Sequence, residues 1–470
     1  MIWQTAPNLG IRQSTKLVKE IYTLKALINQ VYMRFLGGLE EKGAENQALF
    51  NLRREDKLYM SESAFEAFIS KLGIAENKEQ SAYIQSIYFD TTDQAMPLGW
   101  AVRTRSYFKE QPESVVINDE RYMVDEGYIL FNTKKKHRYS ASIKEIENLL
   151  NKNVTLRIGG FRPYVVTSYK RRVFESQDVR ITFDSDIWLF SIGADMSVKR
   201  LNTPTNSELE IKYLDGGRFD VAEMARSLGG IHAVSKHYLA YNMKYIEEKD
   251  RVQSAASYME TPGKEVELKF DIKDDTVFRK LIVKIATGSI PNFRLWEVFP
   301  EPATMESYNE YRVVPGENKV ARVMYFGGRK PRIVVKDRGT FTENGILIRA
   351  EDKDAMTEGQ ISALLNSDIV SVSRRIKREN LVLSESTGKI YNVSVDLSQT
   401  PGGRELYQLE IEYWRSLRKS GSDPMPEILR EINMLGEYAE KEGAVKSVLR
   451  KEDWTKEDYA AAFHQIAKGK

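Results

Sequence analysis

This chain of 470 residues contains no cysteine and only four histidines. The lack of cysteine excludes disulfides, thiol catalysis and zinc–thiolate sites. With four histidines spread over the chain, a histidine-based metal cluster is not expected. The net charge is also small, +3 from 70 basic and 67 acidic residues, so the chain is not a general polyanion binder and any anion site must be local.

Long apolar runs are missing as well. No run approaches the roughly 20 residues that a membrane-spanning helix needs, and the first residues lack the basic and then apolar layout of a signal peptide. We therefore expect a cytoplasmic protein with no membrane span. The hydrophobic fraction of 41% and the charged fraction of 29% are typical of globular proteins. The length predicts two domains of about 200 residues each.

What the chain does contain is a recurring alternation of charged and apolar residues. It appears in Glu208–Tyr213, Glu265–Phe270 and Leu409–Tyr413. In a strand such a pattern sends the charged side chains to one face and the apolar ones to the other. One segment of this kind is typical of a half-exposed antiparallel sheet. The recurrence, together with basic residues at the same two-residue spacing, favours a functional face on which carboxylates hold a metal and ammonium groups meet phosphate.

Further motifs carry a family resemblance. Gln85–Thr91, the pair Arg103 and Arg105, and Tyr169–Phe174 stand in this order before the segment Glu208–Tyr213. In this arrangement the chain resembles the triphosphate tunnel metalloenzymes, a superfamily that joins the CYTH proteins to the polyphosphate polymerase domain of the vacuolar transporter chaperone. The resemblance covers the chain twice, and the first copy is more similar to the polymerase branch. Spacing supports two copies, because opening and closing acidic segments are separated by 153 residues from Glu55 to Glu208 and by 145 from Glu265 to Glu410.

The resemblance implies an α+β fold with two tandem antiparallel β-barrel tunnel domains, flanking helices and helical extensions at both ends. We predict a helical lead-in over residues 1–50, a first tunnel domain over 51–248, a linker over 249–264, a second tunnel domain over 265–418 and a helical tail over 419–470. The terminal helices are expected to dock on this chain or on a protein partner. Within the first domain, a helix is predicted over 61–72, with Ser63 as its N-cap and Gly73 as its stop.

For the first tunnel, the resemblance implies a set of phosphate-binding basic residues and two metal ligands. The basic residues are Lys57, Arg103, Arg105, Lys134, Lys136, Arg171, Lys212 and Lys236, and the metal ligands are Glu55 and Glu210. Asn132 stands where the family has a glutamate, so one acidic site is missing. Tyr88, Phe89, Tyr107 and Tyr169 are interpreted as core residues.

For the second tunnel, the resemblance implies a similar set. Its substrate-binding residues are Lys269, Arg322, Lys336, Arg349, Arg375 and Lys377, and its metal ligands are Glu265, Glu267, Glu351, Asp396, Glu410 and Glu412. This copy also departs from the pattern, with Val320 in place of an arginine and Lys353 in place of a glutamate. The metal implied is Mg²⁺ or Mn²⁺, which prefer carboxylate and phosphate oxygen.

The function implied is metal-dependent phosphoryl transfer on a nucleoside triphosphate, tripolyphosphate or polyphosphate. Attack by water would make the protein a hydrolase, and attack by a second phosphate chain would make it a polyphosphate polymerase. Two alternatives stay open: an RNA 5′-triphosphatase, and inactive tunnels that only bind polyphosphate or serve assembly. The sequence leaves open which tunnel is active.

Overall fold

The computed structural model divides the chain into two compact units, Met1–Leu49 and Phe50–Lys470. The structure describes residues 51–443, apart from 92–93, 95, 113, 116–121, 131–132, 143, 147–160, 203–206, 215–220, 257–258, 260–263, 316–319, 328–329, 336–338, 351–355, 401–404 and 419–424. The predicted helical lead-in therefore lies outside the described residues, as does the tail beyond Gly443.

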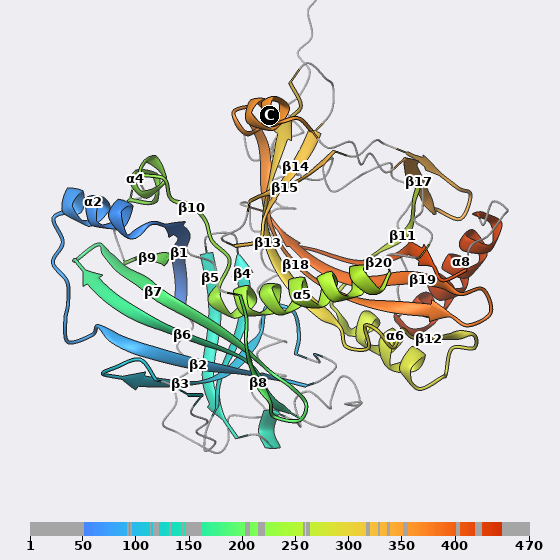
Figure 1. Ribbon diagram of the computed structural model, residues 1–470, viewed down its shortest axis with the longest axis horizontal. Helices are drawn as coiled ribbons and strands as arrows, with labels where there is room; N and C mark the ends of the chain where they lie inside the picture. Colours follow the sequence, from blue (N-terminus) through green and yellow to red (C-terminus); the bar gives the residue numbers. More distant parts are fainter. Residues whose placement is uncertain are drawn as a thin grey trace, which may run out of the picture. The chain divides into compact units, whose positions relative to one another are not determined.

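The first part of the described chain forms a ten-stranded sheet, shown in blue to green in Figure 1. Its neighbours run β10-β1-β5-β4-β3-β2-β6-β7-β8, and β9 pairs with both β1 and β7. Every pairing between these strands is antiparallel. The strands are β1 (Asn51–Met60), β2 (Ala82–Asp90), β3 (Ala101–Phe108), β4 (Tyr122–Leu130), β5 (Thr133–Ala141), β6 (Arg162–Glu175), β7 (Val179–Ile192), β8 (Val198–Arg200), β9 (Ser207–Tyr213) and β10 (Ile231–His232).

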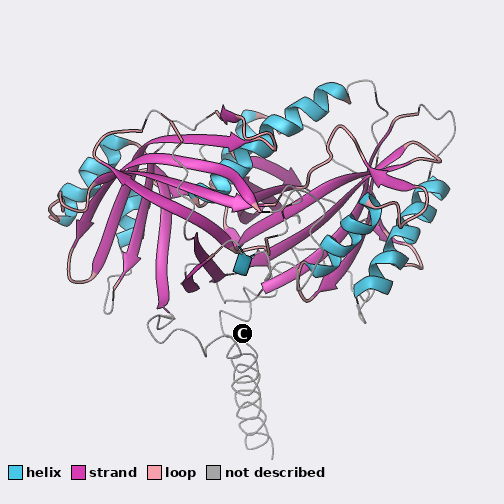
Figure 2. Cartoon of the chain, turned by 90° about the horizontal axis from the view of Figure 1, so that it is seen from below, coloured by secondary structure: helices cyan, strands magenta, loops and turns pink. Residues whose placement is uncertain are grey.

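The second part forms another ten-stranded antiparallel sheet. Its order is β15-β14-β13-β18-β19-β20-β11-β17-β16, and β12 pairs with β18. The strands are β11 (Lys264–Ile272), β12 (Phe293–Leu295), β13 (Ala303–Val313), β14 (Val320–Tyr325), β15 (Arg332–Val335), β16 (Thr340–Phe341), β17 (Leu347–Ala350), β18 (Ile369–Ser384), β19 (Lys389–Gln399) and β20 (Glu405–Ser416). Two antiparallel sheets with flanking helices confirm the α+β class (Figure 2). Two closed tunnel domains stay a prediction.

The described helices are α2 (Glu62–Leu72), α4 (Val221–Ser227), α5 (Lys236–Ala255), α6 (Thr276–Ala286), α7 (Glu358–Leu365) and α8 (Met425–Gly443). Helices α2 and α4 cover one face of the first sheet, and α6 and α8 cover one face of the second. In the first sheet, α2 and α4 share a core with β1, β6, β7 and β9. In the second, α6 and α8 share a core with β11, β19 and β20. The described part of the C-terminal tail thus docks on this chain. No helix among the described residues is long and apolar enough to cross a membrane.

The alternation seen in the sequence decides which side chains enter these cores. On β1 and β9, Leu58, Leu209 and Ile211 are fully buried against α2 and α4. On β11, Leu268 and Phe270 face α8, where Gly436 allows close contact because a Cβ there would lie 2.6 Å from Leu268. Burying each such side chain contributes about 1.5–3 kcal/mol. The interleaved charged residues consequently occupy the opposite face of each sheet.

Helix α5 packs on strands of both sheets, including β6, β7 and β13 (Figure 1). The sheets also meet directly. Gln94 of the first part hydrogen-bonds to Thr304 of β13, and the ring of His232 stacks on that of Tyr308 at 3.8 Å. Arg378 of β18 donates to the carbonyl of Met96 at 2.9 Å. These contacts place both sheets in one compact unit.

Two local expectations need correction. Ser61, not Ser63, is the N-cap of α2, because its side chain accepts the Ala64 amide while Ser63 already lies in the first turn. The stop at Gly73 is confirmed, since this residue adopts φ 65° and donates its N–H to helical carbonyls, a conformation that suits glycine. In addition, α5 continues to Ala255, so the first residues of the predicted linker are helical. Packing against both sheets stabilises this polar stretch as helix, which its composition does not reveal.

The buried carboxyl of Asp90 gives a pH-dependent prediction. It accepts hydrogen bonds from the amides of Thr91 and Met96 and from the Tyr241 hydroxyl of α5. Burial raises its pKa to about 6, above the ordinary value of 3.8. The folded state therefore binds the proton more tightly, so the stabilisation is complete below pH 3.8 and is lost as pH rises through 6.

We expect the free energy of unfolding to fall by about 2.5 kcal/mol from this group between pH 4 and pH 7.5. The Asp90→Asn variant should lack that part of the slope. Urea denaturation of both proteins at the two pH values measures the difference. Parallel pH slopes would show that Asp90 keeps an ordinary pKa.

Candidate functional site

The face of the first sheet that points away from α2 and α4 is called its inner face. It gathers basic and acidic side chains around Lys57. Its Nζ lies 3.5 Å from Glu55, 3.3 Å from Glu208 and 3.7 Å from Glu210. Glu210 also meets Lys212 at 3.2 Å. β1 and β9 bring these groups together, because Lys57 lies opposite Glu210 and Glu55 lies opposite Lys212 in the antiparallel register.

Two further cations close this cluster. Arg171 of β6 forms a bidentate pair with Asp184 of β7, at 2.7 and 2.6 Å, and approaches Glu210 at 3.6 Å. Lys236, the first residue of α5, lies 2.5 Å from Asp184 and 2.6 Å from Glu208. Both Asp184 and Glu208 are fully buried. The cluster is therefore a continuous network in which each charge has opposite charges beside it.

The network fixes the protonation states of three of its members, Asp184, Glu210 and Lys57. Burial alone would raise the pKa of Asp184, but Arg171 and Lys236 lower it to about 2. The pKa of Glu210 is likewise held well below its usual value, because Lys212 and Lys57 outweigh burial. Burial opposes the charge on Lys57, yet Glu210, Glu208 and Glu55 raise its pKa overall. At neutral pH these groups therefore carry fixed charges.

The arginine pair extends the site along β3. Arg105 donates to Ser86 on β2 at 3.0 Å, and Arg103 is 6% exposed. The ring of Tyr88 lies beside them: burial would raise its pKa, but Arg103, Arg105 and Lys236 lower it. Tyr169 links this arginine pair to the cluster around Lys57, because the charged groups of Arg171 and Lys236 lie 5.3 and 5.0 Å from its ring centre.

The four aromatic residues expected in the core divide accordingly. Tyr88, Phe89 and Tyr169 are buried, and Tyr88 and Tyr169 border the charged site. Tyr107 is 66% exposed, so its assignment to the core was wrong. It continues the alternation of Arg103 and Arg105 but stands near the end of β3.

The structure thus brings six predicted basic residues to one face. These are Lys57, Arg103, Arg105, Arg171, Lys212 and Lys236, against the four carboxylates Glu55, Asp184, Glu208 and Glu210. Lys134 and Lys136 lie on β5 opposite Arg53 and Asn51 of β1, but their side chains are outside the described part. Asp184 and Glu208 join the site although neither is predicted as a site residue from the sequence. Their two-residue spacing from Thr182 and Glu210 was the available signal.

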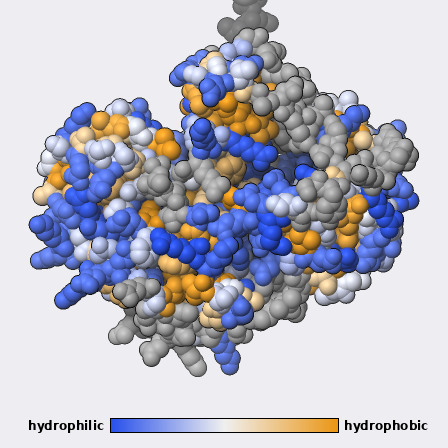
Figure 3. All heavy atoms as spheres, in the orientation of Figure 1, coloured by the Kyte–Doolittle hydropathy of each residue, from blue (hydrophilic) through white to orange (hydrophobic). Residues whose placement is uncertain are grey.

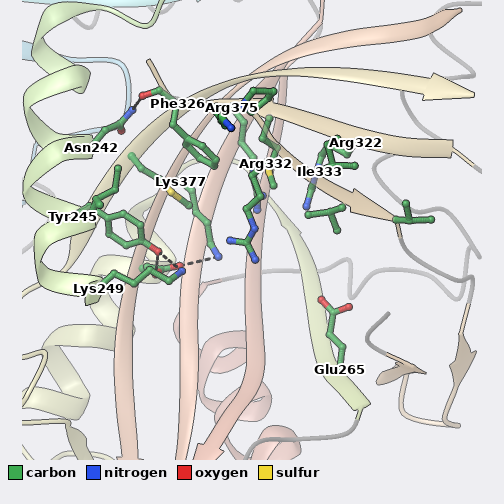
Figure 4. A pocket seen from close by; sticks show the side chains of 18 of the residues that line it. Asn242, Tyr245, Lys249, Glu265, Arg322, Phe326, Arg332, Ile333, Arg375 and Lys377 are labelled. Carbon is green, nitrogen blue, oxygen red and sulfur yellow. Dashed lines mark hydrogen bonds and ion pairs between the residues drawn. The ribbon is translucent and has the colours of Figure 1, made fainter. Parts of the chain in front are cut away.

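The second sheet encloses a cavity of about 1660 Å³. Figure 4 shows part of its lining, where Arg332 of β15 points into the space and Lys377 of β18 approaches Tyr245 and Lys249 of α5. On the surface, hydrophilic residues border the hollow between β14 and β17 (Figure 3). The cavity is therefore reachable from this face, and its lining combines charged with apolar side chains.

Ion pairs link the predicted residues of the second sheet. Arg349 pairs with Glu265 and with Glu267 at 2.7 Å. Lys269 lies 2.7 Å from Glu267 and 3.7 Å from Glu410. Burial lowers the pKa of Lys269, but these two carboxylates raise it overall.

Residues of β14 and β18 line the cavity beside these ion pairs. Arg375 donates to Asp396 at 2.7 Å and to Glu410 at 3.2 Å. Arg322 lines the cavity, and its buried Nε has no hydrogen-bond partner among the residues that the structure describes. Glu412 lines it as well. Lys336 and Glu351 lie outside the described residues.

Helix α5 contributes one side of this cavity, which the sequence does not predict. Lys377 pairs with Glu379 at 2.9 Å, and Tyr245 donates to the same carboxylate at 2.7 Å. Lys249 donates to the Tyr245 hydroxyl at 3.0 Å. Burial raises the pKa of Glu379, but Lys377 and Lys249 lower it to about 2. No local signal connects α5 with Glu379, because Tyr245 stands 134 residues before it.

The carboxylates suit a hard divalent cation without forming a complete cage. Among the described residues, no group of three acidic or histidine side chains is arranged to hold a metal ion. Mg²⁺ is commonly bound by one or two carboxylates together with substrate phosphates and water. Glu55 and Glu210, on one face of neighbouring strands, provide such a donor pair.

Comparison with known proteins finds a family model that matches part of the chain. Residues 52–284, slightly less than half of the chain, match the sequence model of the VTC domain. This confirms the resemblance of the first copy, and it leaves the tandem arrangement untested. No curated protein matches the sequence.

Solved structures resemble parts of the chain weakly. A chain of the Schizosaccharomyces pombe Mediator head module has 9% identity over 44% of this chain and 96% of its own length, with a TM-score of 0.22. The Pct1 RNA triphosphatase of Schizosaccharomyces pombe has 11% identity over 42% of this chain and 86% of its own, also with a TM-score of 0.22. At this TM-score neither structure informs the function of this chain.

Proposed function

We propose that the inner face of the first sheet binds a triphosphate or polyphosphate and catalyses metal-dependent phosphoryl transfer. The observation that carries this proposal is the cluster of six basic side chains around four largely buried carboxylates. The VTC domain match over the same strands supports it. A bound triphosphate would take up the surplus positive charge of this face.

The residues divide into roles by their chemistry. Arg103, Arg105 and Arg171 would bind phosphate oxygens with planar, multiply donating groups, while Lys57, Lys212 and Lys236 act as point charges. Each charge-assisted bond contributes about 1.5–3 kcal/mol, so several together offset the desolvation of the substrate. By the family resemblance, Lys134 and Lys136 add to this set.

Glu55 and Glu210 would hold the Mg²⁺ or Mn²⁺, which when bound neutralises charge on the phosphate oxygens. In the reaction, the bond between the terminal phosphorus and its bridging oxygen breaks, and a new bond forms to a water oxygen or to the end of another phosphate chain. The protein's part is to position the reacting groups and to stabilise the charge.

We further propose that the second sheet is a tandem copy with a related site. The register supports this, because Lys269 lies opposite Glu410 as Lys57 lies opposite Glu210. The two sheets also share most of their strand pairings: β4-β3-β2-β6-β7-β9-β1-β5 in the first sheet corresponds to β15-β14-β13-β18-β19-β20-β11-β17 in the second, although no pairing between described strands joins β15 to β17 as β4 joins β5. The proposed substrate contacts there are Lys269, Arg322, Lys336, Arg349, Arg375 and Lys377, and the proposed metal ligands are Glu265, Glu267, Glu351, Asp396, Glu410 and Glu412.

A phosphorus NMR time course tests the proposed reaction. The purified protein is incubated with Mg²⁺ and either ATP or tripolyphosphate. Signal from interior phosphates of a growing chain would establish a polymerase, and orthophosphate would establish a hydrolase, with triphosphate-ended RNA as the next substrate. If neither appears, the phosphoryl-transfer proposal fails and a binding or assembly role takes its place.

A further inference from the structure

Helix α5 belongs to both halves of the molecule. Its first half, with Leu239 and Tyr241, lies in the apolar cluster of the first sheet. Its second half, with Tyr245 and Val252, lies in a cluster with residues of the second sheet. Lys236, at the start of the helix, joins the charged network of the first sheet, while Lys249 lines the cavity of the second. The placement of Lys236 thus depends on what holds α5.

Glu306 of β13, in the second sheet, holds the first turn of this helix. Its Oε2 accepts the backbone N–H of Ser235 at 3.1 Å and the Ser235 hydroxyl at 3.2 Å. Ser235 is the N-cap but makes no side-chain capping bond to its own helix. A carboxylate at a helix N-terminus is stabilised by the free N–H groups and the helix dipole. The other oxygen of Glu306 accepts from Arg374 of β18.

The backbone of Glu306 fixes the same helix two turns later. Asn242 of α5 donates to the Glu306 carbonyl at 2.8 Å, and its side-chain oxygen accepts the Glu306 N–H at 2.8 Å. One residue of the second sheet, Glu306, therefore forms hydrogen bonds with Ser235 at the start of α5 and with Asn242 within it. Together these bonds fix the position of α5 relative to the first sheet.

We propose that Glu306 is a positioning residue for Lys236, through which the second sheet sets the geometry of the phosphate site in the first. This inference rests on the proposed function. Ser235 immediately precedes Lys236, whose Nζ meets Asp184 and Glu208 at 2.5 and 2.6 Å. Distances this short tolerate little movement of the helix.

The charge of Glu306 argues for more than packing. The residue is 1% exposed, and an ionised carboxylate is costly to bury unless it is fully bonded. Glu306 also neutralises the charge of Arg374. Arg374 lowers the pKa of Lys57, and this is the smallest of the effects that act on that pKa. Without Glu306, the uncompensated Arg374 would act on the phosphate site directly.

The test combines Glu306→Gln with Lys236→Ala in a double-mutant cycle. We expect Glu306→Gln to lower kcat/KM for the phosphoanhydride substrate about 10–100-fold, since a displacement near 1 Å has an effect of that order. In the Lys236→Ala background the same change should have almost no further effect. Full additivity of the two losses would overturn the proposal.

Glu310→Gln is the matched control. Glu310 lies on the same strand and is also buried, but it bonds to Arg312 and Tyr325 rather than to α5. Both variants are compared at equal folded fraction, judged by thermal unfolding. A loss of kcat/KM in Glu310→Gln equal to that in Glu306→Gln would mark both as general stability effects and would also overturn the proposal.

A second measurement needs no substrate and separates this inference from the proposed function. Acetic anhydride labels neutral, accessible amines, and mass spectrometry reads the labelling of Lys236. If Glu306→Gln moves Lys236 away from its carboxylates and lowers its pKa by one unit, labelling should rise about tenfold. Unchanged labelling would overturn the positioning role even if the enzyme is active. Increased labelling in a protein that turns over no phosphoanhydride would support the positioning role while refuting the proposed function.

Discussion

Replacing both Arg103 and Arg105 by alanine should lower turnover about 10²–10⁴-fold, the effect of losing two charge-assisted phosphate bonds. The stability of the fold should change little, because this face already carries more positive than negative side chains among its described members. Removing two cations relieves that excess, which compensates for lost contacts. Steady-state kinetics with the substrate identified by NMR, together with thermal unfolding, measure both effects.

Arg172→Ala is the control for this pair. It follows Arg171 on β6 but points to the other face, where it pairs with Glu66 and Glu76. This variant should keep normal turnover. A double variant of Arg103 and Arg105 that unfolds, or one that retains full turnover, would assign the pair a structural role.

The second large effect is expected at Glu210. Because its pKa lies well below the usual range, this carboxylate is ionised at every working pH, and Glu210→Gln removes a full charge. We expect the Mg²⁺ concentration for half-maximal activity to rise more than about a hundredfold, since even outer partners of metal ligands change affinity 10–100-fold. Metal titration of activity measures this, with Glu66→Gln as a control on the opposite face.

The double variant Glu410→Gln with Glu412→Gln tests whether the second sheet contributes to the Mg²⁺ requirement of the activity. A shifted metal requirement here would support a functional second site. An unchanged requirement would contradict the assignment of these two carboxylates as metal ligands. If Glu210→Gln leaves the metal requirement unaltered, the first sheet loses its proposed metal site.

The sequence was sufficient for the local features that repeat along the strands. Alternation in Glu208–Tyr213 and Glu265–Phe270 predicts which side chains enter the core and which share the charged face, because a strand has a period of two. The stop at Gly73 follows from the conformational freedom of glycine. The family resemblance added the order of the motifs, and the VTC domain match over residues 52–284 agrees with it.

The tertiary structure alone decided what lies opposite each charged residue. Asp184 and Glu208 enter the site because β7 and β9 pair and α5 carries Lys236 between them. Likewise, Glu306 meets Ser235 across 71 residues of chain. Periodicity records only which face a side chain occupies, whereas contacts between distant segments depend on how the sheets and α5 pack. The sequence by itself therefore determined the charged faces, and the packing of α5 against both sheets determined how their residues meet.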